Sequence, residues 1–154
     1  MTAVHRKHAA VAPVYMLEAE VAPGTRTRVH GPLWDGVLNA TPDDTTDGPN
    51  PIEALMAALV ACAARNLRSV TDAAHVTFER VAMRVAVERS DDPPAVTALR
   101  LDLAVTTDVP LDRARRLVEL ALRDATITRT LARGLDLTVL LTINASPTEA
   151  LHVA

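Results

Sequence analysis

The sequence predicts an α+β domain in which two antiparallel hairpins flank a long apolar helix, followed by a second helix and a last strand. Three observations predict this class. Strand-like alternation occurs in two separate pairs of segments, a proline-capped apolar run of helical length lies between the pairs, and an amphipathic stretch comes later. Hairpins that pair mainly antiparallel favour α+β over a doubly wound parallel sheet. The 154 residues suit one domain, expected over 14–144, with a flexible N-terminus at 1–13 and a C-terminal tail at 145–154.

The first hairpin is predicted from the segments Pro13–Val21 and Thr25–His30, which alternate in part between apolar and polar residues. Pro23-Gly24 between them is a turn signal, and Leu33–Leu38 adds a third short strand. The segment Asn39–Asn50 is rich in Asp, Thr, Gly and Pro, a composition that predicts a loop. Long loops in compact domains often shape a site.

The clearest predicted element is a helix from Pro51 to Ala74. Asn50 suits the N-cap, Pro51 the first turn, and Glu53 the third helical position, which together form a variant of the capping box. Every residue over 54–64 is apolar. Because a helix that is apolar all round is buried all round, this part is predicted to be a central core element. Polar residues return from Arg65 onward, where the helix is expected to approach the surface.

The second hairpin is predicted from Val76–Arg89 and Val96–Thr106, joined by a turn at 91–94. One face of the second strand should be buried and the other, with Arg100 and Asp102, solvated. The residues expected on the buried face are Leu99, Leu101, Leu103 and Val105.

The C-terminal third is predicted to hold an amphipathic helix over about Pro110–Asp124, with Asp108 as its cap. A short helical turn near Ile127–Leu131 follows, which Gly134 can end, and then a strand at Leu135–Ile143. We expect the tail from Asn144 to be poorly ordered.

Composition excludes several classes of partner. The net charge of −3, the pI of about 5.9 and the 2% of aromatic residues give neither the basic field nor the stacking platforms that nucleic-acid binding needs. No apolar stretch is long enough to span a membrane, and the first residues lack the apolar segment of a secretory signal, so we expect a cytoplasmic protein. His5 and His8 are expected in a loose terminus and not as metal ligands; we expect no cofactor and no metal.

Cys62, the only cysteine, is the first candidate for chemistry. It could simply be a buried cysteine that packs like a small hydrophobe. With a free pKa near 8.5, only roughly 3% of a thiol is ionised at pH 7, and apolar surroundings disfavour the charged form further. A reactive Cys62 therefore requires a nearby cation.

Three arginines are candidates for that cation. Arg65 follows Cys62 by three residues and lies on nearly the same helix face, while Arg26 and Arg28 could reach over from the N-terminal hairpin. Each could equally be a solvated surface charge. Glu53 lies half a turn away from Cys62 on a straight helix, so its capping role explains it better.

Two segments of the chain resemble the OsmC/Ohr family. The run DGPNPIEALMAALVAC, which ends at Cys62, is similar to the family's cysteine signature, and ATITRTL at 125–131 is similar to its second region. The resemblance covers about residues 14–143. It implies an intertwined homodimer in which two long central helices are sandwiched by sheets, with the sites at the subunit interface.

The resemblance also implies a peroxidase chemistry, in which a cysteine on this helix, activated by an arginine, reduces organic hydroperoxides and then forms a disulfide with a second cysteine. Cys62 matches the peroxidatic position. Gly24-Thr25-Arg26 loosely matches the segment that carries the activating arginine, and Arg28 is nearly as good a candidate. Two positions depart from the pattern: Ala125 replaces the resolving cysteine and Ile52 replaces a glutamate that orients the arginine.

Three functional hypotheses follow. The first is a one-cysteine, thiol-dependent hydroperoxide reductase in oxidative stress defence, which uses Cys62 and is recycled by an external thiol, as the missing resolving thiol requires. The second is a catalytically weak or inactive dimer that binds a small apolar ligand at its interface. The third is a dimer with only a structural role.

Overall fold

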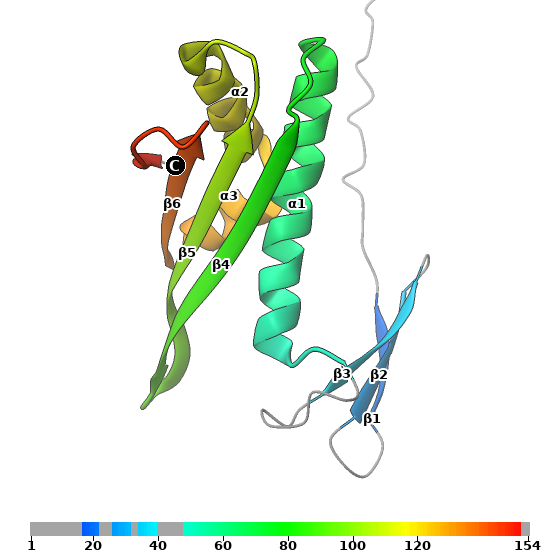
Figure 1. The fold of residues 1–154 in the computed structure, drawn as a ribbon. Coiled ribbons are helices and arrows are strands. Elements are labelled where there is room, and N and C mark those ends of the chain that lie inside the picture. Colours follow the sequence, from blue (N-terminus) through cyan, green and yellow to red (C-terminus); the bar gives the residue numbers. More distant parts are fainter. Residues whose placement is uncertain (1–16, 22–25, 32–33, 40–47, 152–154) are drawn as a thin grey trace, which may run out of the picture. The chain divides into compact units, whose positions relative to one another are not determined.

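The computed structural model describes residues 17–21, 26–31, 34–39 and 48–151 (Figure 1). They belong to two compact units, Met1–Ile52 and Glu53–Ala154, and each unit is described by itself. The described residues form three helices and two mostly antiparallel sheets, so the predicted α+β class is confirmed. The predictions for His5, His8 and the N-terminus at 1–13 lie outside the described residues.

The first unit contains a three-stranded antiparallel sheet in the order β1-β2-β3. Its strands are β1 (Glu18–Val21), β2 (Arg26–His30) and β3 (Asp35–Asn39). His30 and Asp35 are register partners, and their side chains meet with 3.0 Å between Nδ1 and Oδ1. The predicted antiparallel pairing of the N-terminal hairpin and its third strand is therefore confirmed, while the predicted turn at Pro23-Gly24 lies outside the described residues.

Helix α1 (Pro51–Ala73) begins where the sequence predicts. The Oδ1 of Asn50 accepts a hydrogen bond from the backbone N–H of Ile52 at 2.9 Å, which satisfies one of the free donors in the first helical turn. The polar side chain, the proline and the apolar run thus act together to start the helix at this point.

The prediction that α1 is buried on all sides is wrong for a single chain. Its buried residues recur every fourth position, at Leu59, Ala63, Leu67 and Thr71, and so form one face. Another face is left exposed, and its residues are Ala57, Ala58, Ala61 and Ala64. The physical reason is that the one sheet of this unit can cover the helix from one side only.

The second unit contains a four-stranded sheet in the order β4-β5-β6-β7. Its strands are β4 (Arg80–Asp91), β5 (Pro94–Thr106), β6 (Asp136–Ile143) and β7 (Glu149–Leu151). The β5–β6 pair is parallel and the other two pairs are antiparallel. The predicted buried face of β5 is confirmed, because all four of its expected residues are at most 2% exposed. Arg100 on the opposite face is exposed.

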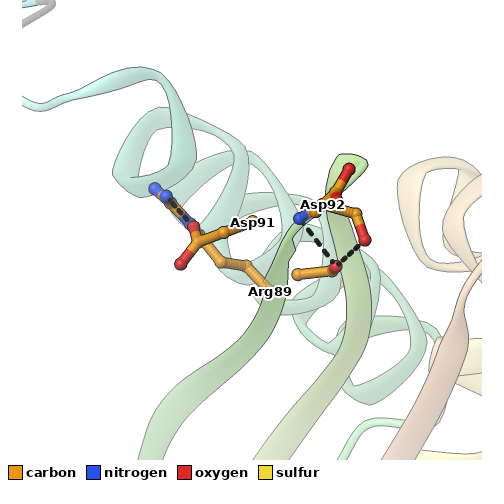
Figure 2. Close-up of polar contacts among 4 residues, drawn as sticks. Arg89, Asp91 and Asp92 are labelled. Carbon is orange, nitrogen blue, oxygen red and sulfur yellow. Dashed lines mark hydrogen bonds and ion pairs between the residues drawn. The ribbon is translucent and has the colours of Figure 1, made fainter.

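The turn between β4 and β5 is held by polar contacts (Figure 2). Arg89 and Asp91 form an ion pair, and the Ser90 hydroxyl bonds with the backbone N–H and carbonyl of Asp92. A register shift between Glu88 and Arg89 precedes the turn. The β4–β5 ribbon therefore ends in a locally stabilised turn, as the Asp-Asp-Pro-Pro segment predicts.

Helices α2 (Leu111–Asp124) and α3 (Thr126–Ala132) lie with α1 along one side of the second sheet (Figure 1). The predicted cap Asp108 is wrong: the N-cap is Pro110, whose carbonyl accepts hydrogen bonds from the N–H groups of Arg113 and Ala114. Asp108 lies two residues before this cap, too early for its carboxylate to serve the first turn. One core joins the sheet to α1 and α2, and it includes Ala63, Leu67, Leu101, Ala114, Val118 and Val139.

The expectation of a poorly ordered tail after Asn144 is also wrong for the described part. Strand β7 pairs with β6, and Leu151 is 7% exposed and belongs to the core. Asn144 closes the preceding turn: its Oδ1 accepts from the N–H of Thr107 at 2.9 Å, and its Nδ2 donates to the Thr107 carbonyl at 2.7 Å. Arg115 on α2 adds an ion pair to Glu149 at 2.8 Å. These contacts hold the segment against the body of the unit.

Candidate functional site at Cys62

Cys62 lies near the middle of α1, at the border between its buried and its exposed face. Ala63 on one side is 1% exposed, whereas Ala61 on the other side is exposed. Cys62 itself is half-buried and is a free thiol. Cys62 is therefore not one of the fully buried residues of the core, where a cysteine is typically inert.

Two N–H donors converge on the Cys62 sulfur. The side-chain amide of Asn66, one turn further along α1, has its Nδ2 at 3.7 Å from Sγ. The backbone nitrogen of Ile127, in the first turn of α3, lies 3.5 Å from Sγ. The first N–H groups of a helix have no acceptor within it, so the Ile127 N–H is free to donate to the sulfur. Hydrogen bonds to the charged form of a group favour that form.

Buried apolar residues of α1 and α2 pack together next to Cys62, and α3 follows α2 directly. Ala63 and Leu67 of α1 pack in the same core as Ala121 and Leu122 of α2. Ala125 connects α2 to α3 and is fully buried, and its carbonyl accepts the N–H of Arg129.

The structure does not place a predicted arginine on the sulfur. Arg65 is exposed, Arg28 is exposed in β2 of the other unit, and of Arg26 only the backbone position in β2 is described. Across the described ranges, the hydrogen bonds to Sγ come from the neutral groups of Asn66 and Ile127. The assignment of Arg26, Arg28 or Arg65 to Cys62 therefore stays a prediction.

Neither donor is among the site residues predicted from the sequence. Asn66 carried a usable signal, because it is the polar residue four positions after Cys62, and side chains at that spacing meet on a helix. The Ile127 donor gives no signal in the sequence, because every residue other than proline has the same backbone N–H. Only the resemblance of the segment 125–131 to a second family region pointed to this part of the chain.

The two departures from the family pattern have clear positions. Ala125 lies two residues before Ile127, whose backbone nitrogen is 3.5 Å from the Cys62 sulfur, so the position expected for a resolving thiol belongs to the segment that contacts this sulfur. Ile52 is the second residue of α1, and its N–H donates to Asn50. Since Cys62 is the only cysteine, an oxidised Cys62 has no thiol partner in its own chain.

A groove of about 400 Å³ runs between α1 and α2 beside the site. Its lining includes Asn66, Val70, Leu117, Leu120 and Asp124. Asn66 therefore both contacts the Cys62 sulfur and lines the groove.

Within the described segments, no group of three or more His, Cys, Asp or Glu side chains is placed to hold a metal ion. Of the helices described, none is both long and apolar enough to cross a bilayer.

Fold and site together define a class of α+β proteins that carry a thiol in the middle of a long helix and close to the start of a later helix. The family model of the OsmC-like proteins matches residues 42–140, more than half of the chain. The chain therefore belongs to the OsmC-like family. No curated protein matches the sequence.

Solved structures share this fold at low sequence identity. An OsmC-like protein from Mycoplasma pneumoniae is similar with a TM-score of 0.78 and 19% identity, over 86% of this chain and 99% of that one. The organic hydroperoxide resistance protein OhrB of Bacillus subtilis gives a TM-score of 0.61 and 17% identity, over 84% and 98%. A protein from Legionella pneumophila, described as an organic hydroperoxide resistance protein OsmC, gives 0.64 and 17%, over 86% and 98%. At such identities the likeness establishes the fold.

Proposed function

We propose that this protein is a one-cysteine, thiol-dependent reductase of organic hydroperoxides that acts in oxidative stress defence. The observation that carries the proposal is Cys62, a half-buried residue whose sulfur accepts from two N–H donors, in a member of the OsmC-like family. Two structures of the same fold come from proteins named for organic hydroperoxide resistance, which supports the choice of substrate class.

The reaction uses the thiolate of Cys62 as nucleophile. The sulfur attacks the terminal oxygen of the hydroperoxide, the O–O bond breaks, and the departing alkoxide takes a proton to leave as an alcohol. The sulfur is oxidised to a sulfenic acid while the peroxide is reduced. An external thiol then attacks this sulfur and releases water, and a second thiol displaces Cys62 from the mixed disulfide. Cys62 returns as a thiol and the external thiols leave as a disulfide.

The external thiol is needed because the chain holds no second cysteine. A cation would favour the thiolate beyond what the two neutral donors provide, and Arg26, Arg28 and Arg65 remain the candidates for it. Arg65 belongs to the same helix as Cys62, whereas Arg26 and Arg28 belong to β2. Alanine replacements of the three, compared in the same peroxidase assay, would rank them.

We expect Cys62→Ser to abolish hydroperoxide reduction, since the serine hydroxyl is not ionised at neutral pH and cannot accept the peroxide oxygen. The measurement is steady-state reduction of cumene hydroperoxide with dithiothreitol or dihydrolipoamide as reductant. Far-UV circular dichroism and thermal unfolding serve as the folding control. Equal activity in wild type and Cys62→Ser would refute the proposal. An unchanged mass of Cys62 after peroxide, together with ligand-dependent thermal stabilisation, would point to a binding protein instead.

We also propose that the protein is a homodimer that covers the exposed alanine face of α1. Ala57, Ala61 and Ala64 lie on this face and are exposed in the single chain. Their spacing puts them on one side of the helix, and small side chains allow a second helix to come close. An extended apolar helix face of this kind is typical of an interaction surface.

We expect wild-type protein to sediment as a dimer and Ala61→Arg to sediment as a monomer or to unfold, because a buried, unpaired guanidinium is costly at a close helix contact. Ala150→Arg, on exposed Ala150 of β7, is the matched control and should stay dimeric. Sedimentation velocity at micromolar concentration is the measurement. A monomeric wild type would contradict the homodimer.

A further inference from the structure

Asn66 makes two contacts with Cys62 from a single amide group. Its Nδ2 donates to the Cys62 carbonyl at 2.8 Å and lies 3.7 Å from the Cys62 sulfur. An amide nitrogen carries two hydrogens, so one can serve the carbonyl while the other points to the sulfur. The bond to the carbonyl holds the amide nitrogen in place, within hydrogen-bond distance of Sγ.

A purely structural role does not require the second contact. Thr71 on the same helix shows this, because its hydroxyl donates to the carbonyl of Leu67, four residues back, at 3.0 Å and touches no sulfur. Asn66 makes the same kind of bond to the residue four positions back, and that residue is the cysteine. The Ile127 N–H approaches the sulfur from α3, so the two donors come from different elements.

We propose that Asn66 is a positioning residue for the Cys62 sulfur, which together with the Ile127 N–H stabilises its thiolate and sets its orientation. The inference rests on the proposed peroxidase function and deepens it. It names a neutral donor pair at the reacting sulfur, in addition to any arginine. When the sulfur becomes a sulfenic acid, the same amide remains within reach of it.

The charged groups around this donor pair are few among the described residues. Arg65 lies on α1, Asp124 at the end of α2 beside the groove that Asn66 lines, and Arg129 on α3. All three are exposed, and none of them hydrogen-bonds to Sγ. Their charges are the same in wild type and in Asn66→Leu, so the difference between these two reports the loss of the amide, whereas Asn66→Asp also adds a negative charge.

The test is the rate of Cys62 alkylation by iodoacetamide as a function of pH, measured on the full chain. Asn66→Leu removes the donor and keeps the approximate size of the side chain. We expect roughly fivefold slower alkylation at neutral pH, a modest effect, because a long hydrogen bond to a thiolate is weaker than most hydrogen bonds to charged groups. At high pH, where every thiol is ionised, the rates should converge. Asn66→Asp replaces the donor by a carboxylate of the same shape and should be slower still at neutral pH.

Thr71→Val is the matched control, because it removes a side-chain bond to a carbonyl of the same helix away from the sulfur, and its pH profile should equal that of wild type. Identical profiles for wild type and a folded Asn66→Leu or Asn66→Asp would overturn the proposal. Failure of both variants to fold would assign Asn66 a structural role and would also overturn it. Alkylation needs no hydroperoxide, so this outcome is independent of whether Cys62 reduces peroxides.

Discussion

Ala125→Cys is expected to change the fate of oxidised Cys62 from overoxidation to an intramolecular disulfide. In wild type the sulfenic acid has no thiol partner in its chain, so excess hydroperoxide should drive it to sulfinic and sulfonic acid. A thiol at Ala125 would lie two residues before Ile127, whose nitrogen is 3.5 Å from the Cys62 sulfur. This is also the position at which the family resemblance places the resolving cysteine.

Intact mass and free-thiol titration after treatment with excess cumene hydroperoxide measure this change. Wild type should gain oxygen atoms at Cys62, whereas Ala125→Cys should lose both thiols without gaining oxygen. Ala132→Cys is the matched control, since it adds a thiol at the other end of α3 and should leave Cys62 to overoxidise. Ala125 is fully buried, so the extra sulfur is expected to cost about 1–3 kcal/mol of unfolding free energy, and the variants should be compared below their unfolding temperatures. Overoxidation of Cys62 in Ala125→Cys, to the same extent as in wild type, would contradict the prediction.

Much of the fold follows from local patterns in the sequence. The alternation over Leu99, Leu101, Leu103 and Val105 places one face of β5 in the core, and each of these side chains is buried. The Asn50-Pro51 pair starts α1 at the predicted residue. In both cases the deciding interaction lies within a few residues of the pattern, so the pattern is sufficient.

Other features depend on parts of the chain that are far apart. Strand β7 has three residues and forms only because β6 offers it an edge, while Asn144 ties its turn to Thr107, 37 residues earlier. The contact between Cys62 and Ile127 spans 65 residues. Local sequence patterns do not predict contacts between residues so far apart in the chain. The burial of α1 within one chain is not predictable for the same reason, since the pattern shows that a face is apolar but not which neighbour covers it.

Leu101→Ala is expected to be the most destabilising single change in the core. Leu101 is fully buried on β5, which has hydrogen-bonded neighbours on both sides, and its register partners are Val85 on β4 and Val139 on β6. Because the surrounding strands are fixed by their ladders, the site can collapse only in part, and the cavity should remain. Loss of the buried side chain together with that cavity should lower the unfolding free energy by roughly 3–5 kcal/mol.

Leu111→Ala is the matched control for this prediction, because the same atoms are removed from a side chain that is 45% exposed at the start of α2, and the loss should be below about 1 kcal/mol. Urea unfolding followed by circular dichroism gives both values. All variants should be measured at one protein concentration, since the proposed dimer would couple stability to concentration. A loss at Leu101 no larger than that at Leu111 would mean that the sheet and helices of the second unit do not pack as one core. In that case the start of α3 would also lack the support that brings the Ile127 N–H to the Cys62 sulfur.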